Sequence, residues 1–251
     1  MNGDKRMPRY YTNAMRQLTI RSTSVNLPHF QDEEEEEAIL EKITSTRLAD
    51  TLVSRFELKD SSVRALNMER IKLMDGRLSS LRSEATNMHA AEFLNIELIN
   101  CDLGSLHWAS GKVSRTRFTD CKLLGARFEN VTMEHVIFID CKLDYTTFNR
   151  IRAAGPVIFI RCSLREAEFS GCDLTGTLWD KCNLAMTSFG NGKYSSCDLR
   201  GNDLSTARGV YHLRRVIIAD AQLLQLSEAL ASELEVTFGS DEDTASNPTT
   251  Q

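Results

Sequence analysis

Large apolar side chains recur at every fifth position through the middle of the chain. This rhythm suits neither a half-buried strand, which alternates with a period of two, nor an amphipathic helix, with its period of 3.6. The series runs from Leu98 to Phe148, and after one inserted residue it resumes at Phe159 and continues to Leu204. With one interruption it can be followed back to Leu58. We expect these positions, called centres from here on, to face the interior.

A second inward position lies two residues before each centre. All seven cysteines fall in this slot, and eight of the eleven phenylalanines are centres. The cysteines are Cys101, Cys121, Cys141, Cys162, Cys172, Cys182 and Cys197. Side chains two residues apart share one face of an extended segment, and the residue between them points to the other face. That residue is often acidic, as at Asp102, Asp173 and Asp198, and we expect it to face solvent.

The period of five predicts a coil built from short flat segments. The two residues after each centre must turn the chain, because strand alternation would otherwise continue. Each turn then buries its side chains against its neighbours, which is the architecture of an all-β solenoid. The hexads VIFIDC (136–141) and VIFIRC (157–162) should lie on adjacent coils. The extra residue between them is expected as a bulge near 153–156, where glycine and proline permit a local departure.

This pattern resembles the pentapeptide repeat family, in which Ala, then Asp or Asn, then Leu are followed by two variable residues. The resemblance covers roughly residues 50–210 and is carried by Cys101-Asp102-Leu103, Ala126-Arg127-Phe128, Cys172-Asp173-Leu174, Cys182-Asn183-Leu184 and Cys197-Asp198-Leu199. It implies a right-handed quadrilateral β-helix with four pentapeptides in each coil.

The composition of the chain predicts four parts. Residues 1–49 form an N-terminal segment, in which the acidic run 32–37 is expected to begin a short helix. Residues 50–210 form the β-helix, and 211–238 a capping or dimerisation segment. Residues 239–251 are polar and are expected to be disordered.

The cysteines are expected to pack rather than to react. Cys101, Cys121 and Cys141 should form a column, continued across the insertion by Cys162 and Cys182. A metal site would need convergent ligands, whereas parallel thiols among Leu and Phe suit apolar packing. The five histidines show no ligand spacing. No metal, cofactor or catalytic residue is therefore predicted.

One side of the predicted rod carries apolar residues in outward slots. They are Ile99, Ile137, Ile139, Ile158, Ile160 and Leu178. A contiguous apolar patch usually marks a contact. Two interpretations stay open: contact with another protein or a second copy, or cover by a terminal segment of the same chain, for which residues 10–30 are the candidate.

The rhythm of five ends after Leu204, and a helix is predicted over 220–234 with Asp220 at its N-cap. Four leucines fall at helical spacing on it: Leu223, Leu226, Leu230 and Leu234. A helix at the end of a solenoid can block the open edge of the sheet. The family resemblance implies a second role, because a C-terminal helix joins two rods as a homodimer in several of its members.

Charge is concentrated at the ends of the chain. The net charge is −5, yet residues 51–210 carry 19 acidic and 21 basic side chains. No apolar run is long enough to span a bilayer and the N-terminal residues do not show a basic-then-apolar signal, so a cytoplasmic protein without a membrane partner is expected. An odd number of cysteines without close pairs favours reduced thiols.

The sequence contains no phosphate-binding loop and no nucleophile–base pair, so an enzyme is not expected. The family resemblance implies binding to DNA gyrase or topoisomerase IV as a mimic of duplex DNA, protecting it from quinolones or natural-product poisons. Such mimicry needs a negative surface, from which the nearly neutral coils depart. The alternative is a structural protein–protein interaction module that uses the isoleucine face. Direct nucleic-acid binding is disfavoured, because no basic stripe emerges.

Overall fold

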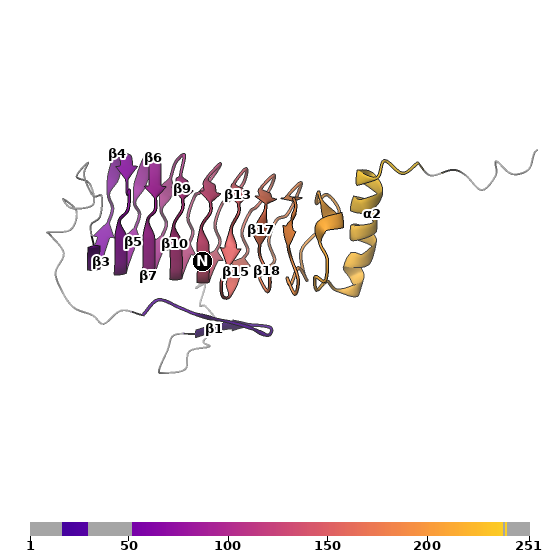
Figure 1. The fold of residues 1–251 in the computed structure, drawn as a ribbon, viewed down its shortest axis with the longest axis horizontal. Helices are drawn as coiled ribbons and strands as arrows, with labels where there is room; N and C mark the ends of the chain where they lie inside the picture. Colours follow the sequence, from indigo (N-terminus) through magenta and orange to yellow (C-terminus); the bar gives the residue numbers. More distant parts are fainter. Residues whose placement is uncertain (1–16, 30–51, 238, 240–251) are drawn as a thin grey trace, which may run out of the picture.

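The computed structural model describes residues 17–29, 52–237 and 239 and shows a parallel β-solenoid closed at one end by a helix (Figure 1). A small N-terminal hairpin lies along one side of the rod. The predicted all-β solenoid is therefore confirmed. The predicted acidic helix and the predicted disordered tail lie outside the described residues, apart from Gly239.

One parallel sheet of ten strands runs along the solenoid. Its members are β3 (Leu52–Lys59), β5 (Lys72–Ser79), β7 (Glu92–Ile99), β10 (Lys112–Thr119), β12 (Thr132–Ile139), β14 (Arg152–Ala153), β15 (Val157–Ile160), β17 (Cys172–Asp173), β18 (Leu178–Asp180) and β20 (Gly192–Lys193). Each strand pairs with the one a full coil away, so that Val113, for example, lies between Phe93 and Met133.

A second parallel sheet of eight strands forms the remaining sides. Its members are β4 (Ser62–Asn67), β6 (Arg82–His89), β8 (Asp102–Leu103), β9 (His107–Ala109), β11 (Arg127–Glu129), β13 (Thr147–Asn149), β16 (Glu168–Ser170) and β19 (Ser188–Phe189). Because each strand pairs with the preceding and the following coil, its backbone N–H and C=O groups are hydrogen-bonded without any long connection between strands.

The corners of the coil fall two residues after the centres. Backbone φ is positive there at successive fifth positions, for example 53° at Asp120, 52° at His135 and 54° at Asp140. This left-handed conformation bends an extended chain sharply. The turn that the period of five requires is thus made by one residue. Most of these corner positions are occupied by residues other than glycine.

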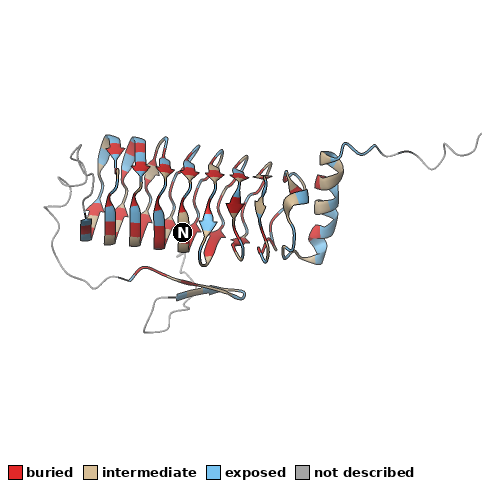
Figure 2. Ribbon diagram, viewed as in Figure 1, coloured by how far each residue is buried: buried red, intermediate tan, exposed pale blue. Residues whose placement is uncertain are grey.

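The centres fill the interior. Phe118, Phe138, Phe159 and Trp179 are stacked, with ring centroids 4.6, 4.9 and 5.8 Å apart along the column. A parallel column is formed by Phe128, Phe148, Phe169 and Phe189. All eight are almost fully buried. Figure 2 shows the resulting alternation of buried and exposed positions around every coil.

The inserted residue lies where the sequence predicts it. Met133 pairs with Ala153, an offset of 20, whereas Val136 pairs with Val157, an offset of 21. The extra residue is therefore taken up between β14 and β15, within 154–156. Because the register is restored at once, Phe138 still stacks on Phe159.

The N-terminal segment contains an element that the sequence pattern did not predict. Strands β1 (Gln17–Ile20) and β2 (Thr23–Asn26) form an antiparallel hairpin that pairs with no other strand in the described part of the chain. Arg21 lies in its turn with φ 55°.

The C-terminal end differs from the prediction in two details. Coil-to-coil pairing continues as far as Ile217, which bridges to Asp198. After the 3₁₀ turns η1 (Val210–His212) and η2 (Asp220–Gln222), helix α2 spans Leu223–Glu233. Asp220 is therefore not the N-cap of the helix but the first residue of η2, and Gln222 precedes α2 without a side-chain cap.

Candidate interaction surfaces

The isoleucine face is covered by the chain's own hairpin. Ile137, Ile158 and Leu178 have no exposed surface, and Ile139 and Ile160 are 7% and 6% exposed. They form one apolar cluster with Val25 of the hairpin and Leu27, which directly follows it. These five residues therefore lie beneath the hairpin and are not exposed to solvent. Ile99 lies outside this cluster and is half-buried. Of the two interpretations left open, cover by a segment within 10–30 agrees with the structure.

The hairpin fits this face because its own side chains alternate. Val25 and the residue two positions on, Leu27, are buried against the isoleucines, while Leu18 and Ile20 on β1 pack at the edge of the cluster. Side chains two apart share one face of a strand, so a four-residue strand presents a narrow apolar stripe. The outward isoleucines of adjacent coils form a matching stripe.

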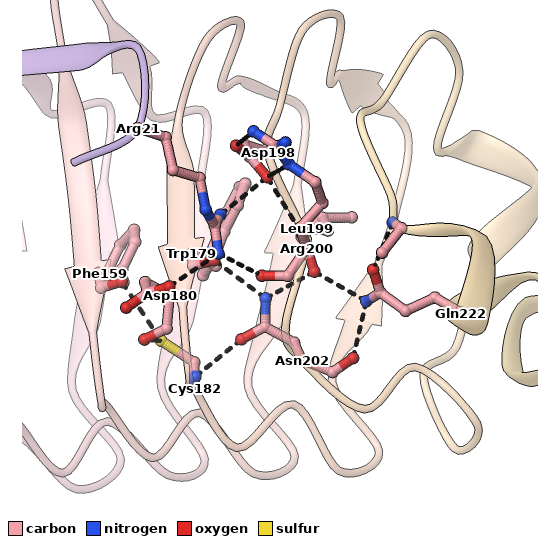
Figure 3. A network of polar contacts seen from close by, with 11 residues as sticks. Arg21, Phe159, Trp179, Asp180, Cys182, Asp198, Leu199, Arg200, Asn202 and Gln222 are labelled. Atoms are coloured by element: carbon pink, nitrogen blue, oxygen red, sulfur yellow. Dashed lines mark hydrogen bonds and ion pairs between the residues drawn. The ribbon is translucent and has the colours of Figure 1, made fainter.

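Arg21 fixes the turn of the hairpin to the C-terminal coils (Figure 3). Its guanidinium lies 2.8 Å from Asp180 and 2.9 Å from Asp198, and it donates a hydrogen bond of 2.8 Å to the carbonyl oxygen of Arg200. Arg200 in turn binds Asp198 through two further hydrogen bonds. Burial tends to raise the pKa of Asp198, but the hydrogen bonds from Arg200 and the charges of both arginines lower it below its usual value.

Asp198 corrects a prediction. It occupies an outward slot, where solvent exposure was expected, yet it is only 4% exposed. The reason is that Arg21 and Arg200 cover it. Nothing in the period of five marks Asp180 and Asp198 as partners of Arg21, because the pairs are 159 and 177 residues apart in sequence.

The hairpin is held at two further points by side chains of the solenoid. The backbone amide of Asn26 donates to Nδ1 of His135 at 3.3 Å. The Asn95 side chain bonds both the amide and the carbonyl of His29, at 2.9 and 2.8 Å. Asn95 and His135 are both corner residues with positive φ. The hairpin therefore follows one edge of the rod over several coils.

The polar network around Arg21 is adjacent to the bonds that attach the cap. Asn202 donates to the carbonyl oxygens of Trp179 and Leu199, and its own side-chain oxygen accepts from the amide of Cys182. Gln222 donates to the carbonyls of Leu199 and Asn202 (Figure 3). These side-chain bonds satisfy backbone carbonyls and one backbone amide near the C-terminal end of the solenoid.

Helix α2 closes the open end of the solenoid. Gln225 accepts a hydrogen bond from the amide of Leu204, and Glu233 accepts one from the amide of Val210. Leu226 and Leu230 pack against the core. Capping of the edge thus accounts for the inner side of the helix.

The four leucines predicted as a dimerisation surface are divided between two faces. Leu226 and Leu230 are half-buried on the solenoid, whereas Leu223 and Leu234 are 63% and 65% exposed. Tyr211, Ile217, Leu224 and Val236 of the same C-terminal part of the chain are exposed as well. We call these six exposed residues the cap surface.

Charges on the coils are paired in register with opposite charges on neighbouring coils. Glu97 lies between Arg77 and Arg117, with N–O distances of 2.9 and 2.5 Å. Burial works to lower the pKa of Arg77, but the hydrogen bonds and charges of Glu97 and Glu57 outweigh it and raise that pKa. Further pairs join adjacent coils: Lys72–Glu92, Lys122–Asp102, Arg161–Asp140 and Lys193–Asp173. The described coils present a patchwork rather than one negative face.

The cysteines are inward, as predicted. All seven are buried and free. Burial is the main cause that raises the pKa of Cys141 and Cys162, and it raises that of Cys172 to about 11. Thiols with such pKa values are poor nucleophiles and poor metal ligands at neutral pH. Among the described residues, no group of three or more His, Cys, Asp or Glu side chains is arranged to hold a metal ion.

A family model described as the pentapeptide repeat region matches residues 111–208. This part of the chain belongs to the pentapeptide repeat family. The match covers the coils from β10 to β20, and the same five-residue geometry continues on the N-terminal side to β3. A search of curated proteins found no match.

Solved pentapeptide repeat structures show a distant likeness. A trypsin-treated form of QnrB1, described as a plasmid-mediated fluoroquinolone resistance protein, is 15% identical, with 72% of this chain and 98% of that chain covered and a TM-score of 0.41. Full-length QnrB1 is 14% identical, with 72% of this chain and 99% of that chain covered and a TM-score of 0.32. HetL is a pentapeptide repeat protein involved in heterocyst differentiation regulation from the cyanobacterium Nostoc sp. strain PCC 7120. It is 14% identical, with 69% of this chain and 89% of that chain covered and a TM-score of 0.20. Sequence identities and TM-scores this low indicate neither a partner nor an activity for this chain.

None of the helices in the described ranges has the length and apolarity that a membrane span requires.

Proposed function

We propose that this pentapeptide repeat protein is a non-catalytic protein-binding scaffold that joins a second copy of itself through the cap surface. One observation carries the proposal. Six of the nine large apolar side chains that are exposed in the described residues lie between Tyr211 and Val236, at one end of the rod. Exposed apolar side chains gathered at one site usually mark a contact with another protein.

A second copy fits this surface for two reasons. Two-fold contacts place the same patch of both subunits against each other, so an apolar patch is its own complement. The inner side of α2 is already occupied by the solenoid, which leaves Leu223, Leu224 and Leu234 for an external partner. This agrees with what the family resemblance implies for C-terminal helices.

Changing Leu223 and Leu234 together to glutamate should weaken self-association by at least about tenfold, because burying two uncompensated carboxylates is unfavourable. Sedimentation equilibrium of the full chain measures the dimer dissociation constant. Leu124→Glu is the matched control, since Leu124 is 49% exposed on a middle coil away from the cap and should leave the constant unchanged. A wild-type chain that stays monomeric at about 100 µM would refute the proposal.

Gyrase or topoisomerase IV binding as a duplex-DNA mimic stays a prediction of the family resemblance. A phosphate-binding groove selects a continuous negative surface. The in-register pairs Lys72–Glu92, Lys122–Asp102 and Lys193–Asp173 interrupt such a surface on the described coils. The charge pattern therefore favours the scaffold.

We expect a DNA gyrase supercoiling assay with a quinolone to show no recovery of supercoiling when micromolar protein is added. A protective pentapeptide repeat protein serves as the positive control. Dose-dependent recovery of supercoiling would support the DNA-mimic hypothesis. This result does not depend on the outcome for the cap-surface variants.

A further inference from the structure

The β1–β2 hairpin is not part of either sheet of the solenoid. β1 pairs with β2 alone, and among the described residues no backbone-to-backbone hydrogen bond joins 17–29 to the coils. Its main chain is attached through side chains instead, those of His135 and Asn95. The hairpin can therefore leave the rod without breaking any sheet ladder.

The apolar contact under the hairpin is also separate from the core. Val25 and Leu27 cluster only with the outward isoleucines and Leu178, whereas the core beneath is built from centres such as Phe138 and Phe159. Removing the hairpin would leave that core complete. It would uncover an aliphatic stripe running over three neighbouring coils, which is a surface that soluble proteins rarely leave exposed.

The charged attachment of the hairpin lies near solvent. The Arg21 side chain is 24% exposed and Asp180 is 20% exposed. Salt screens a partly exposed pair such as Arg21–Asp180, although less than a fully exposed one, and it screens the pair with the 6% exposed Asp198 least. The contact is therefore specific, because two carboxylates and a carbonyl converge on one guanidinium, yet it can be displaced by a competitor with the same chemistry.

We propose that the hairpin is a displaceable strap over a docking face, and that this face takes an extended protein segment carrying aliphatic side chains two residues apart and an arginine. The hairpin itself shows the required chemistry: Val25 and Leu27 fill the isoleucine stripe, and Arg21 neutralises Asp180 and Asp198. A partner without a cation would leave the nearly buried Asp198 with Arg200 as its one remaining guanidinium partner among those described here. This site is distinct from the cap surface and does not depend on it.

Hydrogen exchange of the full-length chain tests the strap. In Arg21→Glu the amides of 17–29 should exchange at least about tenfold faster, because a detached two-stranded hairpin is only marginally stable in water. Asp180→Asn is the second variant; it weakens the same contact from the solenoid side and leaves the hairpin sequence intact. Amides of β7, β10 and β12 should keep their protection in both variants, which shows that the rod is folded. Unchanged exchange of 17–29 in both variants would overturn the proposal.

A labelled peptide with the sequence of residues 17–29, QLTIRSTSVNLPH, tests the docking face. It should bind the Arg21→Glu chain at least about tenfold more tightly than wild type, in which the face is occupied. The same peptide with Arg21→Glu is the matched control and should bind both chains more weakly. Equal binding of the unmodified peptide to wild type and variant would overturn the proposal, whatever the oligomeric state.

Discussion

Replacing Phe138 by alanine should lower the free energy of unfolding by about 3–5 kcal/mol. Phe138 is fully buried, and its ring is stacked between Phe118 at 4.6 Å and Phe159 at 4.9 Å. The substitution removes one ring from a column in which each ring stacks on the rings of the adjacent coils. Because each coil contacts only the next one, the cavity interrupts the nearest-neighbour coupling on which a solenoid depends.

Denaturant unfolding followed by circular dichroism measures this loss. Phe138→Leu keeps most of the volume and should cost less than about 1.5 kcal/mol. Tyr145→Ala is the surface control, because Tyr145 is 54% exposed at a corner, and its effect should stay within about 0.5 kcal/mol. A loss of less than about 1 kcal/mol for Phe138→Ala would mean that the aromatic column does not carry the stability of the rod.

Glu97→Ala should lower the free energy of unfolding by about 2–3 kcal/mol, less than a fully buried pair would give because its arginine partners are partly exposed. The Glu97 side chain is 2% exposed, and Arg77 and Arg117 contact it from the coils on either side. Without it, two guanidinium groups lie on alternate coils of one face with no carboxylate between them.

Glu97→Gln keeps the shape and some of the hydrogen bonding and should cost less than Glu97→Ala. Glu84→Ala is the matched exposed control: Glu84 is 80% exposed and 4.0 Å from Arg64, so the change should stay within about 0.5 kcal/mol. Thermal denaturation of the three variants under one buffer condition gives the comparison. Equal losses for Glu97→Ala and Glu84→Ala would show that the buried position of Glu97 adds nothing.

The interior of the rod follows from the sequence pattern almost position by position. Phe118, Phe138 and Phe159 were identified as centres because they recur at a fixed interval, and all three are buried. The inserted residue was placed near 153–156, and the register changes there from 20 to 21. These predictions succeed because each depends only on contacts between neighbouring coils, which the repeat interval itself specifies.

The outer surface was predicted less well, for a physical reason. An outward slot was equated with exposure for Asp198, which is in fact buried, and for Ile137 and Ile158 the choice between exposure and cover by the chain itself was left open. The covering residues come from another part of the chain, and a short strand such as Gln17–Ile20 carries too weak an alternation to be matched to a distant surface. At the cap, helical spacing identified the leucines but did not show that Leu226 and Leu230 face inward.

By itself the sequence determined the solenoid, its inward residues and the place of its insertion, because the same local contact is repeated in every coil. Only the tertiary structure decided which apolar residues remain accessible. Arg21 meets Asp198 across 177 residues, and Asn26 meets His135 across 109. Each of these contacts occurs only once, so a repeating sequence pattern cannot predict it. Each also depends on where the hairpin lies on the folded solenoid.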